Sequence, residues 1–232
     1  FQNSNTDTTG SWVDLGDVHN RPDSLTLSAW VYPRELPTND WTIIAGKAKG
    51  NNENYDLRVD QNNGDLAALV RWKENGGEGD AYHIMNTGIT TTNQWYLLTL
   101  TFDSDKQEAK VYINGQEKDS HSIPQSTLNQ NNYPFGIARR GTNESTNYDF
   151  FNGLIEEVRV YNRALSSNEI TDVYNLSSPT AEKVTERDIA SNDSGGISRY
   201  PLNGDSTGIP DIWSGNDGTD NTDSGYSTGI YD

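Results

Sequence analysis

Two adjacent carboxylates, Glu156 and Glu157, are the residues in this sequence whose type and spacing first suggest chemistry. Retaining glycosidases cleave a glycosidic bond with two carboxyl groups about 5 Å apart on one face of a site. Adjacent residues of a strand point to opposite faces, so this pair does not provide that arrangement. His19, His83 and His121 are scattered, without the spacing of a nucleophile–base pair or a metal site. We therefore expect a protein that is not an enzyme.

Glu156 taken alone suggests a second kind of chemistry. It shares the two-residue strand period of Leu154 and Val158, which places its carboxylate on the apolar face. A buried carboxylate needs an ionic or hydrogen-bonding partner, or a metal ion. Two interpretations stay open: an acid held by Arg159 or a backbone amide, and a metal ligand.

Three aromatic residues, Trp41, Trp72 and Tyr82, could stack on sugar rings beside the glycine-rich acidic loop 73–80. Most aromatic residues of a sheet sandwich are simply part of its core, because large rings bury the most apolar area. Carbohydrate binding and core packing are thus alternative interpretations of the same residues.

The elements that must position these residues are predominantly strands. Residues 24–33 alternate between two apolar or aromatic faces, which is typical of a central strand covered on both sides. The period of two also predicts strands at 41–45, 55–59, 66–72, 81–85 and 95–102. Asn114-Gly115 predicts a tight hairpin. Ser166 lies three residues before Glu169, a capping-box spacing that predicts one short helix over 166–174.

Residues 153–166 read Gly-Leu-Ile-Glu-Glu-Val-Arg-Val-Tyr-Asn-Arg-Ala-Leu-Ser. This run resembles the C-terminal signature of laminin-G-like domains of the concanavalin-A-like lectin/glucanase jelly-roll superfamily, with Glu156 where the family usually has Asp. Residues 12–16, 111–115 and 134–138 resemble further family segments, so the resemblance covers about residues 12–175. It implies an all-β, two-sheet antiparallel jelly-roll sandwich, in a family whose laminin-G-like members are mostly non-catalytic.

The C-terminal residues resemble the opening of the same family. Tyr200-Pro201-Leu202-Asn203-Gly204 is similar to its first strand, and residues 211–219 to the loop that follows. We expect a jelly-roll body at 1–175, a polar linker at 176–199 and a displaced first strand at 200–232. Tyr200 and Leu202 would form the strand, and Ile212 and Trp213 would anchor the loop. This segment either enters a neighbouring subunit or folds back as a circular permutation.

The resemblance also implies a calcium ion, because family members often hold a structural calcium at the rim of the sandwich. Calcium takes six to eight oxygen ligands. Asp211, Asn216 and Asp217 would join Glu156 in such a site if the terminal segment docks beside it.

The chain of 232 residues has 17 Lys and Arg against 34 Asp and Glu, a formal charge of −17. That charge excludes nucleic acid and anionic membrane surfaces as expected partners. Concentrated salt would screen the self-repulsion, so the composition favours a halophile, with a cation-binding acidic surface as the alternative. No apolar run approaches the roughly 20 residues of a membrane span. There is no cysteine, hence no disulfide framework.

Asn143, Asn175 and Asn192 begin glycosylation sequons, which supports an extracellular or cell-surface location. The sequence favours a non-catalytic structural subunit of a halophile. It would assemble head-to-tail with copies of itself, by C-terminal strand donation, into a filament or adhesive surface array. The alternatives are a carbohydrate-binding adhesin module, calcium-dependent and bound to surface glycans, and an ancillary domain of a larger enzyme.

Overall fold

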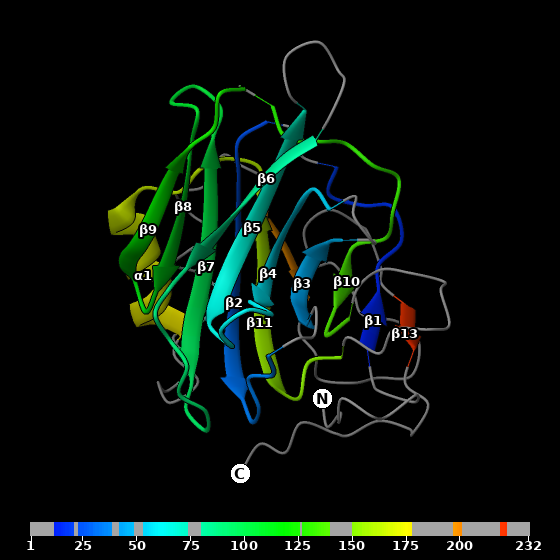
Figure 1. Cartoon of the computed structure of the whole chain (residues 1–232), viewed down its shortest axis with the longest axis vertical. Helices are drawn as coiled ribbons and strands as arrows, with labels where there is room; N and C mark the ends of the chain where they lie inside the picture. The colour runs from blue at the N-terminus through cyan, green and yellow to red at the C-terminus, as the bar shows by residue number, and fades with distance from the viewer. Residues whose placement is uncertain are drawn as a thin grey trace.

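The chain folds as a sandwich of two antiparallel sheets in a computed structural model (Figure 1). The structure describes residues 12–20, 23–38, 42–48, 53–73, 80–125, 127–139 and 150–177. It also describes the backbone of two short strands at 197–200 and 219–221. The predicted all-β jelly-roll class is confirmed.

Two sheets make up the described part of the chain. Sheet A has the order β13 (Thr219–Asn221), β1 (Trp12–Asp14), β10 (Gly136–Ile137), β3 (Thr42–Lys47), β4 (Tyr55–Val59), β5 (Leu66–Lys73) and β6 (Asp80–Asn86). Sheet B has the order β12 (Ile197–Tyr200), β11 (Gly153–Tyr161), β2 (Leu25–Pro33), β7 (Tyr96–Asp103), β8 (Glu108–Ile113) and β9 (Gln116–Ser122). The single helix of these residues, α1, spans Ser167–Ser177.

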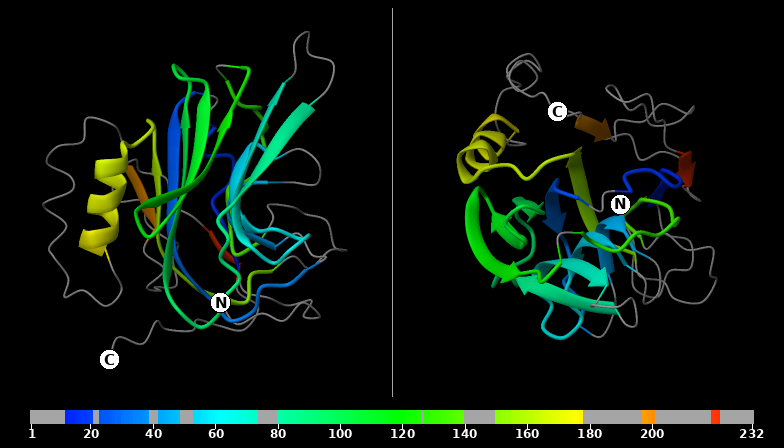
Figure 2. Two further views of the ribbon diagram at one scale, coloured as in Figure 1. Left: turned by 60° about the vertical axis from the view of Figure 1, so that its left-hand side comes forward. Right: turned by 90° about the horizontal axis from the view of Figure 1, so that it is seen from above.

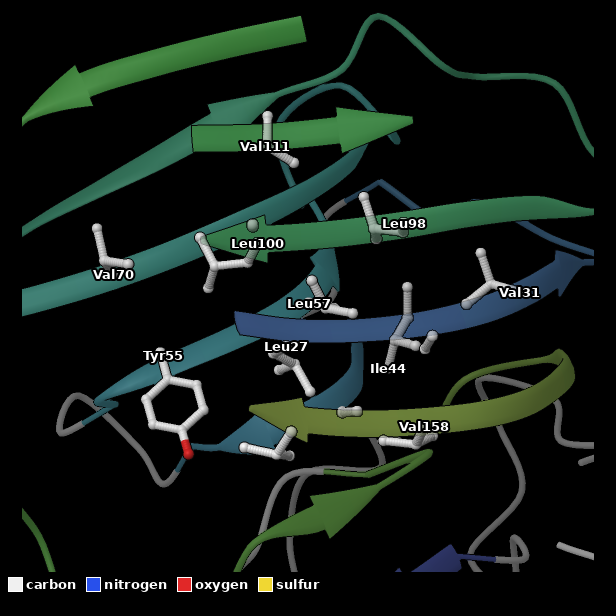
Figure 3. Packing of buried hydrophobic residues seen from close by; sticks show 14 of the residues in the cluster. Leu27, Val31, Ile44, Tyr55, Leu57, Val70, Leu98, Leu100, Val111 and Val158 are labelled. Atoms are coloured by element: carbon white, nitrogen blue, oxygen red, sulfur yellow. The ribbon is translucent and has the colours of Figure 1, made fainter. Parts of the chain in front are cut away.

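The core lies between the sheets, as the strand period predicts. Alternate apolar residues of β2, β7 and β8 point from sheet B toward those of β3, β4 and β5 from sheet A (Figure 3). The central position of β2, between β11 and β7, explains why it is apolar on both faces. Its second face carries Trp30, which is covered by α1.

Helix α1 packs on the outer face of sheet B, as the edge-on view shows (Figure 2). Ile170 and Val173 are its buried residues, and they join a cluster around Trp30. The predicted capping box is confirmed: the Ser166 N–H donates to Glu169 Oε2 at 2.8 Å, and the Glu169 N–H to Ser166 Oγ at 3.3 Å. The helix continues to Ser177, three residues beyond the predicted end, where Trp30 Nε1 donates to Ser177 Oγ.

The Asn114-Gly115 hairpin between β8 and β9 is also confirmed. Both residues have positive φ, 52° and 80°, as a type I′ turn requires. The turn holds the neighbouring strand as well, because the Leu97 N–H donates to Asn114 Oδ1 at 2.9 Å.

The predicted core face of β11 is right for Val158 and Val160 but wrong before them, where Ile155 rather than Leu154 faces the core. Glu157 has φ 51°, and the pairing with β2 shifts between Glu156 and Arg159, which is a β-bulge. Ile155 and Val158 therefore both face the core, although they are three residues apart. Glu156 falls on the opposite face and is exposed, so it is not on the apolar side as predicted.

Two strands of the C-terminal segment lie at the same side of the sandwich. In the single chain, β12 pairs antiparallel with β11, with Tyr200 opposite Val158, and β13 pairs with β1. Each thus continues one sheet at the side away from β6 and β9 (Figure 2). Of the predicted linker, residues 176–177 complete α1 and 197–199 belong to β12.

Candidate functional site

Strands β4 and β5 carry charged side chains on the outer face of sheet A, the face turned away from the core. Leu57 belongs to the core, so Asp56 and Arg58 on either side of it point outward. Val70 likewise belongs to the core, which places Arg71 on the outer face of β5. These outward side chains are nevertheless almost completely buried.

Buried ion pairs hold these arginines. Arg58 Nε and Nη2 donate to the two carboxylate oxygens of Asp56, each at 2.6 Å. Arg71 Nη2 donates to Glu53 Oε2 at 2.7 Å, and the other oxygen of Glu53 lies 3.9 Å from Arg58 Nη2. Burial disfavours the charge on Arg58, but the carboxylates of Asp56, Glu53 and Asp60 outweigh it, so the pKa of Arg58 is raised. Each of the two arginines is thus paired with a carboxylate.

Asp56 fits at this place because Gly46 lies opposite it on β3. A Cβ on Gly46 would come within 2.5 Å of the Asp56 Cβ, well inside van der Waals contact. The glycine lets β3 pass beside the ion pair.

Two asparagines flank Arg71 through its backbone. The Arg71 N–H donates to the Asn54 carbonyl and the Asn129 N–H to the Arg71 carbonyl, both at 2.9 Å. The two side chains are buried, with 0% and 2% exposed, yet neither amide has a hydrogen-bond partner in the described part of the chain. An unpaired buried polar group costs about 1–3 kcal/mol. Both amides are thus buried polar groups whose hydrogen-bonding capacity is not used by the described residues.

Tyr82 is the exposed aromatic residue next to this cluster. It lies opposite Arg71 in the β5–β6 ladder, with 50% of its surface exposed. The Arg71 guanidinium carbon lies 4.9 Å from the centre of the Tyr82 ring. This cation–π contact supports the ring from one side and leaves exposed aromatic surface on the rim of sheet A.

The three aromatics predicted to bind sugar do not form one platform. Trp72 points into the core, is 5% exposed and packs against His121, so the core interpretation holds for it and the platform prediction is wrong. Tyr82 lies on the opposite face of sheet A. Trp41 is outside the described residues.

The predicted calcium site loses its main argument. Glu156 is exposed rather than buried among apolar side chains; partial desolvation and the neighbouring Glu157 carboxylate raise its pKa. Asp211, Asn216 and Asp217 lie outside the described residues. Within the described ranges, no three His, Cys, Asp or Glu residues are grouped to hold a metal ion. Calcium stays a prediction that chelation can test.

The other predicted sites are only partly described. Asn175, a sequon asparagine, is exposed on α1, whereas Asn143 and Asn192 fall outside the described ranges. For the assembly strand, Tyr200 belongs to β12. Leu202, Ile212 and Trp213 are not described. No helix in the described part of the chain is both long and apolar enough to span a membrane.

A second cluster closes the side of the sandwich away from the tail strands. His83 on β6 and His121 on β9 stack at 3.6 Å with an interplanar angle of 9°, and His121 also packs on Trp72. Burial and the nearby His121 lower the pKa of His83, and Asp119 opposes this shift. The stack joins sheet A to sheet B.

Sequence reasoning missed the polar cluster of the outer face: Glu53, Asn54, Asp56, Arg58, Arg71 and Asn129. One signal could have indicated it, because charged residues alternate with apolar ones in residues 55–59. That alternation gives the face but not the partner, since Glu53 and Arg71 belong to different sequence segments.

Comparison with known proteins agrees with this architecture. Residues 7–171 match the family described as the concanavalin A-like lectin/glucanases superfamily. A crystal structure from Bacteroides ovatus ATCC 8483, described as a candidate carbohydrate-binding protein, is similar with 20% identity and a TM-score of 0.64. The alignment covers 92% of this chain and 56% of that one, so this chain spans little more than half its length.

A second similar structure is a heptameric pentraxin from Limulus polyphemus, with 14% identity and a TM-score of 0.52. The alignment covers 85% of this chain and 88% of the pentraxin. At these identities the likeness concerns the fold. No curated protein sequence matches the chain.

Proposed function

Because the chain belongs to the concanavalin A-like lectin/glucanase superfamily, we propose that it is a non-catalytic carbohydrate-binding module. Its glycan site would be the rim of sheet A at β4–β6. One observation carries the proposal: an exposed aromatic ring, Tyr82, lies beside a cluster whose buried amides, Asn54 and Asn129, have no partner among the described residues.

These groups suit a sugar for physical reasons. A pyranose presents an apolar C–H face, which packs on an aromatic ring, and hydroxyl groups that both donate and accept hydrogen bonds. A side-chain amide offers two donors and an acceptor, so it can pair with neighbouring hydroxyls. Strands β4 to β6 are paired along their length, which would hold these groups in place before the ligand arrives.

We expect Tyr82→Ala to weaken glycan binding by about tenfold or more, because burying an aromatic ring against a ligand is worth about 1.5–3 kcal/mol. Isothermal titration against glycans selected on an array measures this. Tyr82→Phe keeps the ring and should bind nearly as well. Lys118→Ala, on exposed β9 of the other sheet, is the matched surface control. Unchanged binding by Tyr82→Ala would contradict the proposed location.

We also propose a second function, assembly by strand donation, which would make the protein a structural subunit of an extracellular filament or surface array. The edge of β11 supports it, because this edge accepts a four-residue strand, β12, with pairs from Val158–Tyr200 to Tyr161–Ile197. A neighbouring chain's segment could form the same hydrogen bonds. Residues 178–196 connect α1 to β12. If β12 paired with β11 of a neighbouring chain instead of its own, only this connection would have to change, and the contact between the two strands would stay the same.

A truncation after Gly196 tests assembly, because it removes β12 and β13 together. Donation predicts that the full chain forms polymers by light scattering, and that the truncated chain stays folded but monomeric. Polymers that persist after truncation would contradict donation. A full chain that is monomeric at all concentrations would assign β12 to its own sandwich. Adding EDTA to both assays tests the predicted calcium.

A further inference from the structure

We propose that the rim of sheet A selects uncharged glycans and rejects those that carry carboxylate or sulfate groups. This inference rests on the proposed carbohydrate site and specifies its ligand class. It follows from how the two arginines of the cluster are compensated, and from which polar groups have no partner among the described residues.

The charges of the cluster cancel within it. Arg58 makes a two-point ion pair with Asp56, and Arg71 is paired with Glu53 at 2.7 Å. Glu53 is 1% exposed and also lies 3.9 Å from Arg58. Arginine is the side chain best suited to grip a sugar carboxylate or sulfate through two parallel hydrogen bonds. At this face, both arginines are already engaged in ion pairs with carboxylates of the protein itself.

An acidic sugar would therefore have to displace Glu53 from Arg71. That would leave a carboxylate buried without its closest cation, which is the costly half of breaking a buried ion pair. We expect this to lower affinity for an acidic sugar by about a hundredfold relative to its neutral counterpart. The formal charge of −17 adds a long-range repulsion of the same sign.

The two unpaired amides of the cluster are neutral. The amides of Asn54 and Asn129 are uncharged hydrogen-bonding groups, and Tyr82 offers ring surface. Arg71 Nε, which is buried like the two amides, also has no hydrogen-bond partner in the described ranges, while Nη2 is held by Glu53. Such a set recognises hydroxyl groups without requiring a negative charge.

The experiment compares matched neutral and acidic polysaccharides: galactan with polygalacturonate, mannan with alginate, and β-glucan with heparin as a sulfated probe. Affinity electrophoresis and titration calorimetry at 0.15 M and 1 M NaCl supply the affinities. We expect retention by at least one neutral polymer, unchanged between the two salt concentrations, and none by the acidic ones. Acidic polymers that bind more tightly than neutral ones, with affinity falling as salt rises, would overturn the selectivity but leave carbohydrate binding intact. Binding to no glycan at all would instead refute the proposed function.

Glu53→Gln provides the positive test, because it removes one negative charge and keeps a side chain of similar size. Arg71 then lacks its carboxylate, and we expect affinity for polygalacturonate to rise at least tenfold. Glu108→Gln on β8 makes the same change of charge on the other sheet and should have no such effect. Circular dichroism checks that each variant is folded. If Glu53→Gln fails to fold, the salt dependence of the wild-type chain decides alone; if it folds without gaining acidic ligands, the inference is wrong.

Discussion

At the scale of single residues, the outer face of sheet A is unusual because it buries charges rather than apolar groups. Asp56 is 0% exposed and Arg58 1%, on the middle strand between β3 and β5. A buried pair adds little net stability compared with an apolar pair, but losing one partner is costly because the other charge stays buried. The pair therefore makes the face intolerant of single substitutions.

We expect Asp56→Asn to lower the free energy of unfolding by about 3–5 kcal/mol, because Arg58 would lose the carboxylate that holds both its Nε and Nη2. Urea unfolding followed by tryptophan fluorescence measures it. Lys106→Ala removes an ion pair with Asp103 on the surface and should leave the unfolding midpoint unchanged. Equal effects of the two substitutions would contradict the distinction between buried and exposed pairs.

At the scale of elements, the two sides of the sandwich differ in how their edge strands are held. On one side, β12 and β13 extend sheets B and A with backbone hydrogen bonds. On the other, edge strands β6 and β9 meet through the stacked rings of His83 and His121. Two imidazoles at 3.6 Å repel each other when both are protonated, so this second side is sensitive to pH.

We expect the stability of the chain to fall as the pH drops from 7.5 toward 5.5. Burial and His121 keep the pKa of His83 below its usual value, while Asp119, the charged group facing it from β9, acts in the opposite sense. The folded state therefore takes up a proton less readily than the unfolded state. The stability that depends on a neutral His83 is therefore complete above about pH 6.5, and it is lost as the pH falls through the lowered pKa of His83. Thermal unfolding across this range measures the slope.

His83→Phe tests this assignment, because it keeps an aromatic ring on β6 and removes the titrating group. The slope should become flatter between pH 7.5 and 5.5, while His19 and His121 remain. A slope that is as steep in His83→Phe as in the wild type would exclude the stack as its cause.

At the scale of the whole molecule, charge is the dominant feature. The formal charge of −17 destabilises the folded chain, because its excess carboxylates repel one another. The Debye length shortens from about 30 Å at 0.01 M salt to about 3 Å at 1 M, so concentrated salt removes most of this repulsion. We therefore expect the unfolding temperature to rise by several degrees between 10 mM and 1 M NaCl, at roughly 2–4 °C per kcal/mol. An uncharged osmolyte at matched osmolality is the control, and an unchanged midpoint would argue against the halophilic interpretation.

The period of two was enough to predict strands β2 to β7, because alternation can be seen in adjacent residues. Asn114-Gly115 and the Ser166–Glu169 capping box were predictable for the same reason, since each acts within a few residues. The two-sheet architecture was implied by the family resemblance. The candidate site was not predictable in the same way, apart from Tyr82. Glu53 meets Arg71 only because β4 pairs with β5 in one register, and Asn129 reaches Arg71 from a distant loop.

Tertiary structure alone decided three further features. One bulge at Glu157 turned Glu156 away from the core, because a single extra residue reverses the face of all those before it. The burial of Trp72 and the exposure of Tyr82 depended on which face of sheet A meets sheet B. The pairing of β12 with β11 depended on which edge remained open. Local pattern thus determines which elements form, whereas register and neighbours, which are properties of the whole chain, determine which side chains meet.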